Sequence, residues 1–422
     1  MSSIDAGARH TWMGSHTHRS WLLGQAQRLL DFFRSSLLED GRFADLDDEG
    51  RPVLLRDASQ PVPGQRLLTV ARAVHCYALG ELLGVPGCAP IVEHGLGALW
   101  DEHRDAEAGG YVQIVGATGP VDATKSAYGH AFVLLAASSA LVAGHDAQPL
   151  YDDVLSVIDQ HFWSEDDGAA REAFAADWDE LEPYRGANAN MHLCEAFLAA
   201  ADATGDQGLV ERASRIARLL IDGHARAHGW MLPEHYDPAW RPQLGFNRDG
   251  AHYDLLRPYG ATIGHMLEWS RLLSAAWIAT GKHDAWMPQA AVELFATAVL
   301  LGWDREHGGL SFTVDWDGSP ANPDHYWWPV AEGISASAFL LQLTAEPVYE
   351  DWYRKFWDFA GAHLIDYARG GWYPELDATN RRKVGLWYGK PDLYHTLQSC
   401  LVPLLTPAPS IAGALRSVPP VP

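Results

Sequence analysis

The sequence predicts an all-α protein, an (α/α)6 barrel of six helical hairpins with short β-hairpin loops at its mouth. Three observations lead to this fold class. A short glycine–aromatic signal recurs at intervals of roughly 60 to 80 residues, which is the mark of a repeat architecture. The segments between its copies have helical periodicity, and they alternate between amphipathic and almost wholly apolar ones.

The recurring signal marks the turns of the repeat. Each copy combines glycines, which permit a tight bend, with apolar residues that pack beneath it, and so predicts a short turn or hairpin. The copies are DGRFADLDDEG from residue 40, GGYVQIV from 109, HGWMLPEHYD from 228, GGLSFTVDWDG from 308, GGWYPELD from 370 and a weaker one, DDGAAREAFAADWD, from 166.

The helical segments form six pairs. The first member of a pair is amphipathic, as in WLLGQAQRLLDFFRSSLL (21–38) and VYEDWYRKFWDFAGAHLI (348–365). The second is richer in Ala, Leu and Ser, as in AYGHAFVLLAASSALVA (127–143) and EGISASAFLLQLT (332–344). A helix that is apolar on all sides is buried on all sides. We therefore expect six outer helices around six inner ones.

One catalytic domain is expected over residues 19–405, because six units of about 65 residues account for nearly the whole chain. Residues 1–18 are predicted to be an N-terminal tail. Residues 406–422, TPAPSIAGALRSVPPVP, are rich in proline and are predicted to be a loose C-terminal tail.

The net charge and the cysteine content limit which partners the protein could bind and which cellular compartment it could occupy. The formal net charge is -23, which argues against nucleic acid and anionic membranes. No stretch approaches about 20 uninterrupted apolar residues, so no membrane span is expected. The four cysteines are far apart and form no CxxC pair, which favours a reduced, cytoplasmic protein.

Polar residues gather near the N-terminal ends of the predicted inner helices. Hairpins that repeat in one direction bring these ends to one mouth of the barrel, and convergent polar groups in a concave pocket are the default candidate for an active site. In chain order the residues are Arg72 and His75, Tyr128 and His130, Asn188, His192 and Glu195, His265 and Glu268, Trp328 and Glu332, and His395 and Gln398.

Each of these residues also has a structural interpretation. A lone buried histidine is more often a hydrogen-bonded core residue, and His75 and His130 fit that description. Three histidines at equivalent positions of a repeat, His192, His265 and His395, instead favour function. Trp328 could belong to the core or to the pocket.

Arg72, in a buried helix, needs a partner, since an unpaired buried charge costs several kcal/mol. Glu195, Glu268 or a substrate could fill that role.

Two HxxE pairs leave a choice between metal binding and proton transfer. His192 with Glu195, and His265 with Glu268, have a spacing that could ligate a metal. No HExxH motif or clustered Cys/His/Asp set accompanies them. We favour glutamates that fix the histidine tautomers, with no metal and no cofactor.

At these residues the chain resembles the N-acylglucosamine 2-epimerase superfamily, and in particular its bacterial D-mannose isomerase branch. The resemblance runs from about residue 20 to 405. It rests on TVARAVHCYALG, RGANANMHLCEAFLAA, RPYGATIGHMLEWSRLL, YWWPVAEG and WYGKPDLYHTLQ. Pro391 stands where sulfoquinovose isomerases carry a polar residue, which argues against a sulfonated sugar.

The resemblance implies the same barrel, metal-free sugar chemistry and a set of site residues. His265 and His395 match the acid/base histidines. Arg72 matches the arginine that binds sugar oxygens, and Glu268 matches the glutamate that supports a catalytic histidine. The residues that match substrate or pocket contacts are Asn188, His192, Tyr128, Trp328 and Glu332, and we add Glu195 to them.

The leading hypothesis is an isomerase of free D-mannose and D-fructose, with D-lyxose and D-xylulose as a further pair. His265 opens the ring and His395 moves the C2 proton through a cis-enediolate that Arg72 stabilises. A sugar 2-epimerase is the alternative. An inverting glycoside hydrolase and a non-catalytic sugar-binding barrel are more remote. A monomer or homodimer is expected.

Overall fold

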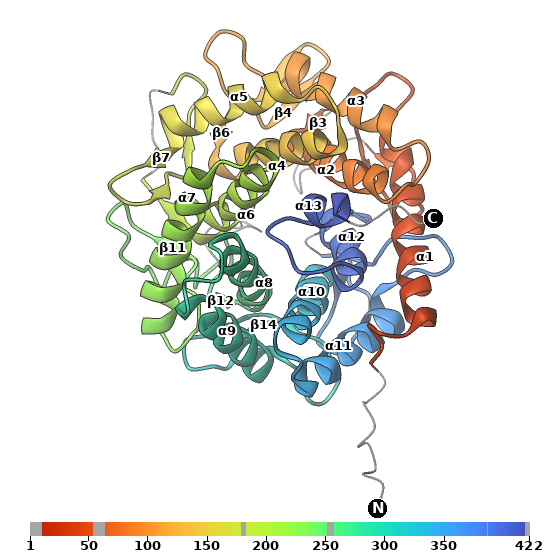
Figure 1. The fold of residues 1–422 in the computed structure, drawn as a ribbon, viewed down its shortest axis with the longest axis vertical. Coiled ribbons are helices and arrows are strands. Elements are labelled where there is room, and N and C mark those ends of the chain that lie inside the picture. Colours follow the sequence, from red (N-terminus) through yellow and green to blue (C-terminus); the bar gives the residue numbers. More distant parts are fainter. Residues whose placement is uncertain (1–10, 54–63, 179–182, 251–256, 386, 418–422) are drawn as a thin grey trace, which may run out of the picture.

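Two concentric rings of helices form the molecule (Figure 1). The computed structural model describes residues 11–53, 64–178, 183–250, 257–385 and 387–417. The outer ring holds α1 (His16–Phe33), α3 (Ala89–Ala98), α5 (Gln148–Val157), α7 (Gln207–Ala217), α9 (Trp286–Gly302) and α11 (Pro347–Phe359). The inner ring holds α2 (Leu67–Leu82), α4 (Ala127–Ala143), α6 (Ala187–Thr204), α8 (Ile263–Ala279), α10 (Trp327–Thr344) and α12 (Tyr394–Leu401). The predicted barrel of six hairpins is confirmed.

Burial separates the two rings as the residue pattern predicts. In α4 every residue from Gly129 to Ala140 is buried, because the helix has neighbours on all sides. In α7 the buried residues recur with helical spacing and form one stripe: Leu209, Val210, Ala213, Ile216 and Ala217. Short π-helical segments extend four of the outer helices in the described ranges, at Leu99–His103, Ile158–Phe162, Arg218–Ala225 and Ala360–Leu364.

Short antiparallel strands tie neighbouring repeats together at one end of the barrel. Five of the inner helices begin directly after a strand: β3 (Gln65–Arg66), β6 (Lys125–Ser126), β10 (Arg185–Gly186), β12 (Ala261–Thr262) and β14 (Pro320–Tyr326). Each of these pairs with a strand that follows the next outer helix: β4 (Ile114–Gly116), β9 (Ala173–Phe174), β11 (His235–Tyr236), β13 (Ser311–Val314) and β15 (Glu375–Leu376). This pairing fixes where each inner helix starts.

Five further strands lie in the same loops. Four of them form the hairpins of β1 (Asp45–Leu46) with β2 (Pro52–Val53) and of β7 (Trp163–Ser164) with β8 (Ala169–Ala170). β5 (Gly119–Asp122) pairs with β4, and β13 pairs with β14. The hairpins lie on the predicted glycine–aromatic copies, so the mouth has the β-hairpin loops that the sequence indicates.

The C-terminal segment departs from the prediction of a loose tail, which is wrong for residues 406–417. A short helix, α13 (Ile411–Arg416), packs against α2, α4 and α6, and Figure 1 shows it inside the inner ring. Its small residues permit close approach, and Ser410 caps it and binds Asp202. At the other end of the chain, Ser15 caps α1 and the Trp12 amide binds Glu350. Every helix in the described ranges is too short or too polar to cross a lipid bilayer.

Candidate active site

A cavity of about 530 Å³ opens at the end of the barrel where the inner helices begin. Eight of the ten site residues predicted from the sequence line it: Arg72, Tyr128, Asn188, His192, His265, Glu268, Trp328 and His395. It also contains residues that the prediction missed: Pro258, Thr262, Phe312, Trp327 and Trp387.

The other two predicted residues lie behind this wall. Glu332 is fully buried beneath His395. Glu195 faces a second cavity, of about 590 Å³, which the C-terminal segment 405–414 helps to enclose. Both glutamates therefore contact pocket residues and do not line the pocket themselves.

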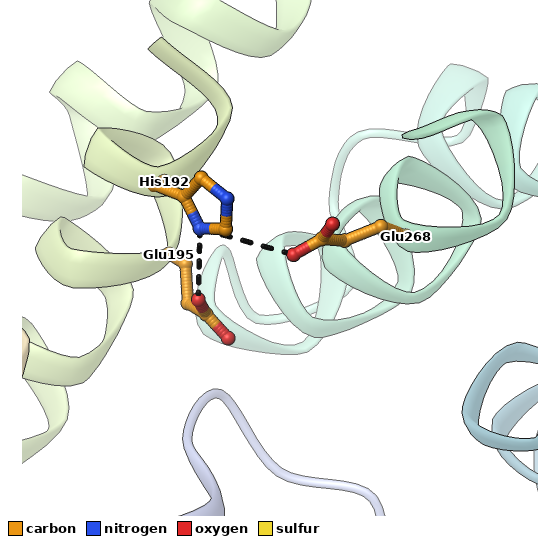
Figure 2. Close-up of side chains that lie close together, drawn as sticks. All are labelled: His192, Glu195 and Glu268. Atoms are coloured by element: carbon orange, nitrogen blue, oxygen red, sulfur yellow. Dashed lines mark ion pairs between the residues drawn. The ribbon is translucent and has the colours of Figure 1, made fainter. Parts of the chain in front are cut away.

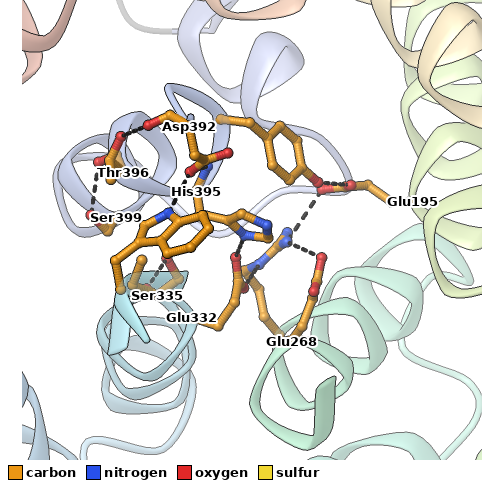
Figure 3. A network of polar contacts seen from close by, with 12 residues as sticks. Glu195, Glu268, Glu332, Ser335, Asp392, His395, Thr396 and Ser399 are labelled. Atoms are coloured by element: carbon orange, nitrogen blue, oxygen red, sulfur yellow. Dashed lines mark hydrogen bonds and ion pairs between the residues drawn. The ribbon is translucent and has the colours of Figure 1, made fainter. Parts of the chain in front are cut away.

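His395 and Glu332 form a histidine–carboxylate pair across α12 and α10 (Figure 3). The Nδ1 atom of His395 lies 2.8 Å from Oε1 of Glu332. Burial opposes ionisation of Glu332, but Arg271 and the bond to His395 outweigh it and hold its pKa below the usual value. Because the carboxylate is ionised, Nδ1–H donates, and the Nε2 lone pair of His395 is left for the pocket.

His265 forms the matching pair, and its partner is Glu234. Nδ1 of His265 lies 3.0 Å from both carboxylate oxygens of Glu234, a buried residue that precedes β11. The expected support from Glu268 is wrong. Helix side chains lean toward the N-terminus, so His265 reaches the hairpin while Glu268, one turn deeper, lies beside Arg271.

Aromatic rings pack against the two histidines. The ring centroid of Trp328 lies 5.1 Å from that of His265 and 5.7 Å from that of His395. Trp327 meets Trp387 edge to face at 5.2 Å. Flat aromatic faces bind the C–H surface of a sugar while leaving its hydroxyl groups to the polar residues. Trp328 is thus both buried and part of the pocket.

Arg72 is held by groups other than the predicted ones. Its Nη2 donates to the Tyr128 hydroxyl at 2.9 Å, and its Nη1 lies 3.4 Å from Oδ1 of Asp392. The sequence-based choice of Glu195 or Glu268 as partner is wrong. Asp392 also accepts bonds from the His395 amide and the Trp327 indole, both at 3.0 Å, so one carboxylate orients three elements of the site.

Arg271 is a buried cation that the sequence analysis missed. It lies 3.2 Å from Glu195, 3.3 Å from Glu332 and 3.8 Å from Glu268, and Figure 3 shows the three glutamates converging. Burial, followed by the charges of Glu332 and Glu195, raises the pKa of the Glu268 carboxyl well above its usual value. These effects favour the protonated, neutral form of Glu268.

His192 lies between two of these carboxyls (Figure 2). Its Nδ1 is 3.7 Å from Glu195 and 3.9 Å from Glu268, beyond hydrogen-bonding distance. Burial lowers the pKa of His192 to about 4, although Glu195 acts in the opposite direction. The imidazole is neutral at pH 7, and its ring packs on Tyr128 and Phe132.

Two triads have a geometry that could hold a metal ion. They are His192 with Glu195 and Glu268, and Glu268 with Glu332 and His395, each with donor atoms within 4.8 Å of one another. Arg271 contacts all three glutamates and already supplies the positive charge that they need. The donor set therefore suits a guanidinium better than a metal ion.

The two remaining histidines differ. His130 is a core residue, because Nδ1 donates to the Ser126 carbonyl at 2.7 Å and Nε2 accepts from the Tyr111 amide at 3.0 Å. His75 bonds Ser139 through Nδ1 at 2.7 Å, and it lines the second cavity beside Glu195.

The comparisons with known proteins agree with this fold. The family model of the N-acylglucosamine 2-epimerases matches residues 41–399. The chain belongs to the N-acylglucosamine 2-epimerase family. The resemblance inferred from the motifs is thereby confirmed.

Among members of this family, two bacterial relatives match nearly full length. A D-mannose isomerase from Thermobifida fusca is 44% identical over 96% of this chain and 99% of its own. One from Pseudomonas cannabina pv. alisalensis is 43% identical over 97% and 98%. A crystal structure of a D-mannose isomerase gives a TM-score of 0.84 at 28% identity, covering 96% of this chain and 99% of its own. The protein is an isomerase or epimerase of sugars.

Proposed function

We propose that the protein interconverts D-mannose and D-fructose without a metal ion, and that it also accepts D-lyxose and D-xylulose. The observation that carries the proposal is the pair of histidines that both pack against Trp328 in the pocket. Each has Nδ1 committed to a carboxylate, which leaves Nε2 for proton transfer. The names of the relatives support mannose as the sugar.

Ring opening is assigned to His265. A cyclic sugar must release its aldehyde, which needs one group to take the anomeric hydroxyl proton and one to protonate the ring oxygen. His265, oriented by Glu234, takes part in this proton exchange at one wall of the pocket. Trp328 and Trp387 hold the sugar ring, and Asn188 and His192 bind its hydroxyl groups.

Proton transfer between C2 and C1 is assigned to His395. Its Nε2 removes the C2 proton, and the electron pair moves to form a cis-enediolate with negative charge on O1. Arg72, fixed by Tyr128 and Asp392, donates hydrogen bonds to that charge. His395 then returns the proton to C1, and transfer of the hydroxyl hydrogen from O2 to O1 completes the ketose.

Epimerisation is the second candidate, and one observation favours it. His265 and His395 come from different helices, and each packs against Trp328 in the same pocket. A proton returned to C2 from the opposite face would give glucose from mannose.

Hydrolysis is less well supported. It needs two carboxyl groups across a scissile bond, whereas Glu195, Glu268 and Glu332 all gather around Arg271.

The test is proton NMR of D-mannose in D2O with enzyme treated with EDTA. Fructose as the main early product is the expected result. Glucose labelled at C2 that appears before fructose would make the protein an epimerase. No change in any free monosaccharide would reject both functions. Activity that EDTA abolishes and a divalent ion restores would overturn the metal-free mechanism.

A further inference from the structure

Glu268 is a pocket carboxyl that the mechanism above leaves without a step. Its side chain is buried and lines the cavity with His192 and His395. Neither of its oxygens has a hydrogen-bond partner among the described residues. Glu268 lies within 4.8 Å of a ring nitrogen of His192 on one side and of His395 on the other. The carboxyl is thus placed where a substrate would meet the catalytic base.

The charges around Glu268 favour its neutral form. Arg271 lies nearer to Glu195 and Glu332, which also accept bonds from Tyr394 and His395. The two negative charges of Glu195 and Glu332 already outnumber the single positive charge of Arg271. A third ionised carboxylate, on Glu268, would therefore be buried beside like charges. The other titratable or charged groups that face Glu268 are Arg72 from α2, Tyr128 from α4, His192 from α6, and Tyr394 and His395 from α12.

Conversion of an aldose to a ketose requires a second proton transfer. The carbon-bound hydrogen moves from C2 to C1, and His395 accounts for it. The hydroxyl hydrogen must also move from O2 to O1. A protonated carboxyl is suited to this task, because one oxygen donates a proton while the other accepts one.

We propose that Glu268, in its acid form, carries the hydroxyl proton between O2 and O1 of the bound sugar. The proposal rests on the isomerase function proposed above. It makes Glu268 a catalytic residue specific to isomerisation, since epimerisation at C2 leaves the O2 hydroxyl in place.

The step balances in two stages. First, His395 takes the C2 proton, the C2–H electron pair forms C1=C2, the C1=O1 π pair moves to O1, and O1 takes the Glu268 proton. Second, the Glu268 carboxylate takes the O2 proton, the O2–H pair forms C2=O2, and the C1=C2 π pair takes the proton of His395 at C1. The aldehyde has become a primary alcohol, and both residues are restored.

His192 is the competing carrier. It is neutral and it lines the same cavity. However, the two nitrogens of an imidazole lie on different sides of its ring, so a single nitrogen facing the sugar would have to donate and accept in turn. The two oxygens of Glu268 can face adjacent hydroxyl groups together.

The experiment is Glu268→Gln, followed in D2O with D-mannose. Glutamine keeps the shape and one donor, but it cannot relay a proton. Formation of fructose is expected to fall 100-fold or more. Exchange of the C2 hydrogen of mannose for deuterium is expected to fall less than 10-fold, because His395 still forms the enediolate. A parallel loss of both rates would overturn the proposal, and so would unchanged fructose formation.

Matched variants separate the remaining outcomes. If His192→Gln, rather than Glu268→Gln, lowers fructose formation while sparing C2 exchange, His192 is the carrier and the proposal fails. If Glu268 is neutral, Glu268→Gln leaves the urea midpoint unchanged, whereas Glu332→Gln lowers it by removing a charged partner of Arg271. A lowered midpoint in Glu268→Gln would also overturn the proposal. If the unmodified enzyme neither exchanges C2 nor forms fructose, the proposed function itself fails.

Discussion

At the scale of single residues, the two histidines proposed as catalytic make the same bond to partners of different origin. Glu332 lies on an inner helix, so the pair with His395 is built into the core. Glu234 lies in the hairpin after α7, so the pair with His265 depends on a loop at the mouth. The position of His265 is thus coupled to the register of β10 with β11.

Glu234→Gln tests this coupling. The amide offers a donor where Nδ1–H needs an acceptor, so His265 can adopt the wrong tautomer or turn away. We expect kcat/KM with mannose to fall by about 100-fold or more, as for other partners that orient an imidazole. Glu306→Gln, in an exposed turn, is the control. Full activity in Glu234→Gln would show that Glu234 does not orient His265.

Helix spacing explains which site residues the sequence could reveal. Side chains near the start of an inner helix point to the mouth of the barrel. This rule predicted His265, His395 and Arg72 as pocket residues, but it says nothing about their hydrogen-bond partners. The partners come from other repeats: Glu234 for His265, and Asp392 for Arg72. Spacing within one helix suggested Glu268 as the partner of His265. Contacts between repeats leave no pattern in the local sequence, so Glu234 could not be predicted in this way.

At the scale of elements, the site depends on how closely α8 and α10 approach. Gly264, next to His265, lies under the ring of Trp328, and a Cβ there would overlap three ring carbons. The helices are therefore spaced for glycine, and this spacing lets Trp328 pack against both histidines.

Gly264→Ala should displace Trp328 and lower kcat/KM by about 10-fold or more, because misplacement by 1 Å can cost about 100-fold. The far-ultraviolet circular dichroism should not change. Gly24→Ala in α1, where no atom lies within 4 Å of the added carbon, is the matched control and should keep full activity. Activity equal to that control would mean that Trp328 tolerates the displacement.

The amino-acid composition of the C-terminal segment did not predict the helix α13. Proline and alanine indicated a loose tail, but Ala412, Gly413 and Ala414 are small enough to pack into the ring. A Cβ at Gly413 would overlap the carboxylate of Asp202, which binds Ser410. The twelve barrel helices have strong periodicity and were predictable; a helix of six residues has too few turns to show one.

Gly413→Ala should therefore destabilise the protein by about 1–3 kcal/mol, the usual cost of overpacking. Urea unfolding measures it. Gly97→Ala, an unobstructed glycine of α3, should be neutral or stabilising. Equal stability of the two variants would indicate that α13 contributes little to the fold.

At the scale of the whole molecule, the barrel buries four histidines in neutral form: His75, His103, His130 and His192. Burial is the main cause in each, and it lowers each pKa to about 4. The unfolded chain binds protons at these groups as pH falls below about 6.5, whereas the folded chain does so only near pH 4. Stability therefore falls as pH falls through this window. The raised pKa of Glu268 has the opposite effect on the free energy of unfolding, which it increases as pH falls. It is one group, however, against four histidines.

Each buried histidine should cost about 2 kcal/mol between pH 7 and pH 5, so the total is comparable with the stability of many domains. Urea unfolding at the two pH values measures the loss. His130→Gln, which removes a group that serves only the core, should make the loss smaller by about 2 kcal/mol. His16→Gln, at an exposed position, should not alter it. Unfolding free energies that stay equal from pH 7 to pH 5 would mean that the folded barrel admits protons to these sites. The packing that keeps the pocket histidine His192 neutral would then not exclude water from the pocket in which the enediolate is proposed to form.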